Sequence, residues 1–90
     1  MSPPTSVASL ESQVLALLVD IAPDVDPAAV RPEQPFRDQF DFDSMDFFNF
    51  AAALHQHFGL DIPERDYPQL TSLAGCIAYL RQRLPGGAAP

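Results

Sequence analysis

The sequence contains no lysine and only five arginines against twelve acidic residues, so the 90-residue chain carries a net charge of −7. Proteins that bind nucleic acid or anionic membranes contact phosphates through Lys and Arg. We therefore expect neither nucleic-acid binding nor membrane insertion. The acidic excess favours partners with basic surfaces, because complementary potentials steer encounter. Acidic side chains also simply keep a small protein in solution, and charge alone does not separate the two readings.

Cysteine is nearly absent as well. Cys76 has no second cysteine to pair with, so no internal disulfide can form and nothing indicates an oxidising compartment. The sequence has neither a basic and apolar leader at its start nor an apolar run long enough to span a bilayer. We expect a cytoplasmic monomer with one small domain, in which folding buries about 60% of the unfolded chain's surface.

Apolar residues recur at helical spacing in three segments, which predicts helices over 7–21, 44–58 and about 72–84. No segment shows the alternation typical of a β-strand. A brief helical turn fits after Pro63, although Pro68 limits its length. The predicted fold class is all-α, a small four-helix bundle with three main helices plus a short one.

Residues at the predicted helix ends support these boundaries. Thr5 or Ser6 can cap the first helix. Asp43 suits the N-cap of the second helix, and Asp46 at the third helical position completes a capping box. Gly59 fits the C-terminal stop of that helix.

The segments between the helices differ in character. Residues 22–43 form a long loop between the first and second helices, and a loop of this length in so small a domain is often functional. Residues 1–5 and 85–90 are rich in Pro, Gly, Ala and Ser, which predicts loose tails around a domain over 6–84. The residues expected to pin the long loop to the core are Val30, Phe36 and Phe40.

The second predicted helix has two apolar faces. A helical wheel places a core stripe on one side, formed by Phe47, Phe50, Ala51, Leu54 and Phe58. Met45, Phe48 and Ala52 lie off that stripe, on the other flank of Ser44. They form either a partner-docking patch or a surface that the long loop or the third helix covers.

The stretch from Asp43 to Asp46 opens this helix and is the most informative part of the chain. Ser44 lies between carboxylates and has no histidine or lysine beside it to make its hydroxyl a nucleophile. A serine hydrolase would also need a strand–turn–helix elbow and oxyanion glycines, which the sequence lacks. Such a serine is better suited to being modified than to catalysis.

The run Phe40-Asp41-Phe42-Asp43-Ser44-Met45-Asp46 resembles the signature of acyl carrier proteins, Leu-Gly-x-Asp-Ser-Leu/Met-Asp/Glu. The resemblance covers about residues 6–84 without obvious insertions. Further matching positions, in order along the chain, are Phe36, Phe50, Leu54, Phe58, Gly59, Ile62, Pro63, Thr71, Ser72, Leu73, Ile77, Tyr79 and Leu80.

The resemblance implies a carrier and not an enzyme. A phosphopantetheinyl transferase would move a 4'-phosphopantetheine arm from coenzyme A to the Ser44 hydroxyl, and the arm's thiol would hold acyl groups as thioesters. The implied partners are acyl-transferring, ligating or condensing enzymes of fatty-acid, polyketide or specialised acyl metabolism. The implied partner-contact residues are Asp43, Met45, Asp46, Phe48 and Ala52. The implied acyl-pocket residues are Phe36, Phe47, Ala51, Leu54 and Cys76.

The sequence departs from the family pattern in three places. Asp41 occupies the usual glycine slot, which carries a cost if that residue needs a positive φ. Phe47 stands where the family commonly has a small residue, which predicts a narrowed acyl pocket. Positions that usually carry glutamates for basic partners are here Asn49, His55, Gln56 and His57. We expect a dedicated partner enzyme that recognises the apolar side chains of Met45 and Phe48 more than the charge of the helix.

Other functional classes fit less well. The aspartates do not match the ligand spacing of a calcium loop, and His55 and His57 face different ways on a helix, so no metal site is predicted. The lack of a Gly-Gly before the serine disfavours a peptidyl carrier. The alternatives are a non-covalent interaction module that keeps the carrier fold without the arm, or an aminoacyl or peptidyl carrier.

Overall fold

The computed structural model describes residues 7–84, so the predicted tails and the predicted N-cap of the first helix lie outside the described residues. All regular structure in this range is helical, with no strand, which confirms the all-α prediction. The elements are α1 (Val7–Ile21), η1 (Pro27–Ala29), α2 (Phe36–Gln39), α3 (Ser44–Phe58), η2 (Glu64–Leu70) and α4 (Leu73–Arg83), where η denotes a 3₁₀-helix.

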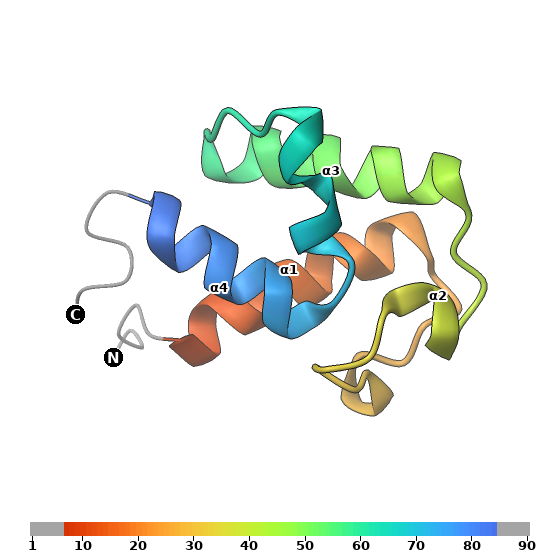
Figure 1. Cartoon of the computed structure of the whole chain (residues 1–90). Helices are drawn as coiled ribbons and strands as arrows, with labels where there is room; N and C mark the ends of the chain where they lie inside the picture. The colour runs from red at the N-terminus through yellow and green to blue at the C-terminus, as the bar shows by residue number, and fades with distance from the viewer. Residues whose placement is uncertain (1–6, 85–90) are drawn as a thin grey trace.

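The core lies where α1 meets α3 and α4, and η2 bridges the space between α3 and α4 (Figure 1). Several of its side chains are fully buried, and burying a Leu or Phe side chain stabilises the fold by about 1.5–3 kcal/mol. The buried apolar residues are Leu10, Val14, Leu18, Phe36, Phe50, Ala51, Leu54, Ile62, Leu70, Leu73, Cys76, Tyr79 and Leu80.

The ends of α3 follow the predicted capping chemistry. The Asp43 carboxylate accepts the Asp46 N–H at 2.9 Å, and the Asp46 carboxylate accepts the Asp43 N–H at 3.3 Å, forming a capping box. At the other end Gly59 adopts a left-handed conformation with φ of 66°. Local sequence therefore sets the residue at which α3 begins and the one at which it ends.

The long loop is more ordered than the sequence suggested, because it contains η1 and α2. Phe36 is fully buried, and its N–H donates to the Thr71 carbonyl at 2.8 Å. The Ala74 N–H donates to the Pro32 carbonyl at 2.8 Å. These two bonds tie the loop to the start of α4 and so fix its position beside the start of α3.

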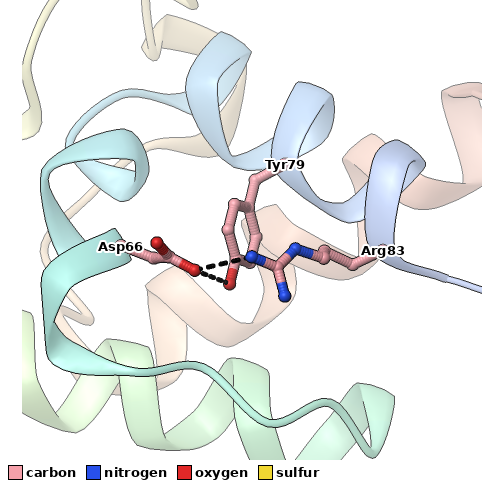
Figure 2. A network of polar contacts seen from close by, with 3 residues as sticks. All are labelled: Asp66, Tyr79 and Arg83. Atoms are coloured by element: carbon pink, nitrogen blue, oxygen red, sulfur yellow. Dashed lines mark hydrogen bonds and ion pairs between the residues drawn. The ribbon is translucent and has the colours of Figure 1, made fainter.

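The short fourth helix forms after Pro63, as expected, but runs past Pro68 to Leu70 as a 3₁₀-helix. A polar cluster of the buried Asp66 and Tyr79 with the exposed Arg83 holds it on α4 (Figure 2). Asp66 Oδ2 accepts hydrogen bonds from the Tyr79 hydroxyl and from Arg83 Nη2, both at 2.8 Å. The Arg83 guanidinium also lies 5.0 Å from the centroid of the Tyr79 ring.

Two absences hold for residues 7–84. None of their helices is both long enough and apolar enough to cross a bilayer. Their His, Cys, Asp and Glu side chains form no group of three that could hold a metal ion.

Candidate functional site

Ser44 is the first residue of α3, and its side chain is exposed. The capping box on either side of it fixes the backbone, so the hydroxyl projects from a rigid helix end. A helix start carries partial positive charge, which favours a negatively charged group nearby. Asp43 and Asp46 oppose such a group electrostatically, so their contribution at this point is to hold the helix end.

An open hollow of about 510 Å³ lies beside Ser44. Its wall comes from α2, the start of α3 and η2, together with residues of the segments that flank them. The lining residues are Pro35, Phe36, Arg37, Asp38, Phe42, Asp43, Ser44, Phe47, Phe48, Tyr67, Pro68 and Thr71.

Aromatic rings dominate this wall and contact one another edge to face. The Tyr67 ring lies 5.6 Å from the Phe47 ring, with the planes at 83°, and 5.6 Å from the Phe48 ring, with the planes at 65°. The Phe42 ring extends the chain of contacts to Phe47 at 6.5 Å. Such pairs stabilise by about 0.5–1.5 kcal/mol beyond their buried area. The hollow beside Ser44 is therefore a pre-formed aromatic surface.

Four of the five residues expected to contact partners are exposed at or near the start of α3, and Asp46 is the exception. Met45 is 68% exposed and Phe48 is 46% exposed, and Ala52 is exposed one turn further on. Asp43 is exposed, whereas Asp46 is half-buried. Of the two readings of this apolar flank, burial under the long loop or α4 does not occur. The Tyr67 ring of η2 contacts Phe48 and covers part of it.

The residues expected to form an acyl pocket divide into two groups. Phe36 and Phe47 line the hollow, whereas Ala51, Leu54 and Cys76 are buried in the core and do not line it. The helical wheel placed Phe47 in the middle of the core stripe, but the structure leaves it half-buried. Its ring faces the open hollow, where it contacts the rings of Phe42 and Tyr67.

Sequence reasoning missed several residues of the hollow. The sequence predicts only a brief helical turn after Pro63, which assigns no role to Tyr67, and it places Phe42 at the variable position of the serine motif. Two features of the sequence could have indicated an aromatic wall: an aromatic residue at the variable position of the serine motif and another in the short helix. Their meeting depends on tertiary packing across more than twenty residues of chain.

Two further positions are explained by the structure. Gly59 is the only residue with a positive φ among residues 7–84, so Asp41 fits the usual glycine slot without left-handed strain. Cys76 is fully buried, and its thiol donates to the Leu70 carbonyl at 3.3 Å. Burial raises the pKa of this thiol well above its usual range, so it remains a neutral packing group.

The site meets the requirements of a phosphopantetheine group. That group needs an exposed hydroxyl as its attachment point and a helix start that tolerates a phosphodiester. The exposed Ser44 hydroxyl at the start of α3 supplies both, and the adjoining hollow offers an apolar surface near the attachment point.

Comparison with known proteins agrees with this fit. The family model described as "Phosphopantetheine attachment site" matches residues 12–80. The meromycolate extension acyl carrier protein of Mycolicibacterium smegmatis is 28% identical over 79 residues, which cover 84% of this chain and 80% of that protein. The acyl carrier protein of Thermobifida fusca is 32% identical over 68 residues, which cover 76% of this chain and 86% of that one. The chain belongs to the acyl carrier protein family, whose members hold phosphopantetheine and act as carriers and not as catalysts.

Proposed function

We propose that Ser44 is the residue to which phosphopantetheine is attached, and that the protein presents acyl groups to partner enzymes. The observation that supports this most directly is the exposed Ser44 hydroxyl at the rigid start of α3 beside an open hollow. When bound, the group supplies a thiol on a flexible arm, on which acyl groups are held as thioesters. The chain itself supplies attachment, positioning and recognition.

Asp43 and Asp46 have a second role in this proposal. Exposed carboxylates next to Ser44 can accept charge-assisted hydrogen bonds from Arg or Lys of the phosphopantetheinyl transferase. The exposure of Asp43 supports this role more strongly than that of Asp46, which is half-buried by its place in the capping box. In this proposal the transferase supplies the base, so Ser44 needs only an exposed hydroxyl.

Modification by a transferase tests the proposal. The purified protein is incubated with coenzyme A and a broad-specificity phosphopantetheinyl transferase, and its intact mass is measured. We expect a gain of one phosphopantetheine, abolished by Ser44→Ala and retained in Ser12→Ala, which alters an exposed serine on α1. An unchanged mass would instead support the alternative, a non-covalent interaction module that keeps the carrier fold.

We further propose that acyl-transferring, ligating or condensing enzymes dock on the exposed side of α3. The large apolar side chains Met45 and Phe48 support this placement, together with the lack of any acidic residue on α3 after Asp46. The relatives named above include a protein of meromycolate extension and a general acyl carrier protein at similar identity, so fatty-acid, polyketide and specialised acyl pathways stay as alternatives. We also predict that the protein is a cytoplasmic monomer. Assays that measure which candidate partner enzymes load an acyl group onto the purified protein distinguish these pathways.

A further inference from the structure

The aromatic hollow beside Ser44 has a consequence for the cargo. Its rings come from three separate segments: Phe36 from α2, Phe47 and Phe48 from α3, and Tyr67 from η2. The loop residue Phe42 completes the wall. Ser44 itself lines the same hollow, so a group tethered to its hydroxyl can fold back onto these rings.

The interior beyond the hollow offers no room for a long chain. The fully buried ring of Phe50 packs against Phe36 and Phe42 of the wall, at 5.4 Å and 6.1 Å between ring centroids. Leu54, Leu70 and Leu80 of the core are also fully buried, and protein cores are packed as densely as organic crystals. Phe47 and Tyr67 close the wall with their edge-to-face contact. A cargo held here is therefore compact and stays in the hollow, with no extension between the helices.

The polar groups in the wall of the hollow do not indicate a charged cargo. The Thr71 hydroxyl already donates to the Pro68 carbonyl at 3.2 Å. The side chains of Arg37 and Asp38 are exposed and reach water at the rim. No buried side-chain polar atom among the described residues lacks a partner. The part of the wall between these rim residues is therefore mainly aromatic ring surface.

Building on Ser44 as the attachment residue, the geometry points to a compact aromatic acyl group as the cargo, held in this hollow. The Tyr67 ring meets the Phe47 ring at 83° and the Phe48 ring at 65°, so the wall presents both ring edges and ring faces. Another planar ring continues that pattern, because aromatic pairs prefer edge-to-face or offset contacts. A saturated ring of the same size gains only the burial of its surface.

The test compares two cargoes of matched size. Benzoyl- and cyclohexanecarbonyl-phosphopantetheine are transferred to Ser44 from the corresponding coenzyme A thioesters, and loading is verified by mass. The rate of thioester cleavage by hydroxylamine is then measured for each loaded protein and for the same acyl group on free pantetheine. Protection is the rate on free pantetheine divided by the rate on the protein. This normalisation removes the intrinsic difference in reactivity. We expect protection of the benzoyl form to exceed that of the cyclohexanecarbonyl form by about threefold to tenfold.

Variants locate the effect. Tyr67→Leu should remove the preference for benzoyl, whereas Tyr67→Phe should retain it because the ring stays. Phe58→Leu alters a half-buried ring at the far end of α3 and should leave the preference unchanged. Nuclear Overhauser contacts between the benzoyl protons and the Tyr67 ring give a readout independent of reactivity.

The outcomes separate this inference from the proposed function. Loading of Ser44 followed by equal protection of the two cargoes would overturn the aromatic preference and leave the carrier function standing. Greater protection of a palmitoyl cargo than of benzoyl would also overturn it, because the interior would then have opened. A chain that accepts no phosphopantetheine at all would overturn both.

Discussion

The hydroxyl of Tyr79 donates to the carboxylate of Asp66 at 2.8 Å, and both residues are buried. This bond joins the middle of α4 to η2, the segment that supplies Tyr67 and Pro68 to the hollow beside Ser44. The geometry of the hollow therefore depends on a polar contact that lies outside it.

Removing this contact should destabilise the protein. Tyr79→Phe deletes one hydrogen bond and should lower the free energy of unfolding by about 1 kcal/mol. Asp66→Ala deletes both bonds and leaves the buried Tyr79 hydroxyl without its acceptor, so its cost should be about 2–3 kcal/mol. Urea denaturation followed by circular dichroism measures both changes. Arg65→Ala, next to Asp66 but exposed, should alter stability by no more than about 0.5 kcal/mol.

Stability should also fall at alkaline pH. Burial raises the pKa of the Tyr79 hydroxyl, and its bond to Asp66 raises it further, although the charge of Arg83 opposes this. Burial likewise raises the pKa of the Cys76 thiol. Both groups ionise earlier in the unfolded chain, near their ordinary values of 10.0 and 9.0. Their contribution is therefore fully present below pH 9 and is lost as the pH rises above it.

Thermal denaturation between about pH 8 and pH 11 checks this pH dependence. Cys76→Ala lacks the buried thiol, so its melting temperature should start lower but decline less steeply with pH. Identical slopes for this variant and the unmodified protein would argue against a role for Cys76 in the alkaline loss. Tyr79→Phe gives the matching measurement for the phenol.

Phe47 should limit the length of acyl chain that the protein can shelter. Phe47→Ala removes the ring that meets Tyr67 and enlarges the hollow toward the core. We expect stronger protection of a palmitoyl thioester against hydroxylamine in this variant than in the unmodified protein. Unchanged protection would contradict the predicted narrowing. Phe47→Leu is the control, because it keeps most of the side-chain volume and should change protection less.

Partner docking should depend more on the apolar flank of α3 than on charge. Phe48→Ala should weaken binding to the cognate enzyme by about tenfold or more, since a central aromatic anchor contributes on the order of 2 kcal/mol. Asp38→Asn, an acidic residue on α2, is the charge control. Calorimetry at low and high salt measures both variants. Binding that disappears at high salt yet survives Phe48→Ala would refute this prediction.

Local sequence was enough to predict the helices and the serine motif. Asp43 and Asp46 cap α3 through groups three residues apart, and Gly59 ends it through its own backbone freedom. The helical periodicity of α1, α3 and α4 is equally local. Such features can be read from sequence because the interacting groups lie within one or two turns of each other.

The long loop and η2 were less predictable. Phe36 was expected to reach the core and does, but η1 and α2 were missed because helices of three or four residues leave no periodic signal. The run of η2 through Pro68 was also missed, since Pro68 was expected to shorten it. Its hold on α4 comes from Asp66, Tyr79 and Arg83, whose charges and hydroxyl gave no local sign of pairing.

The sequence by itself determined the helical fold, the place of Ser44 at a helix start and the acidic character of the chain, because capping, periodicity and charge act between near neighbours. Only the tertiary structure decided that Phe42, Phe47, Phe48 and Tyr67 meet around one hollow beside that serine. Packing of η2 against α3 and α4 brings Tyr67 to rings some twenty residues earlier in the chain. Contacts of that range depend on how the whole bundle closes.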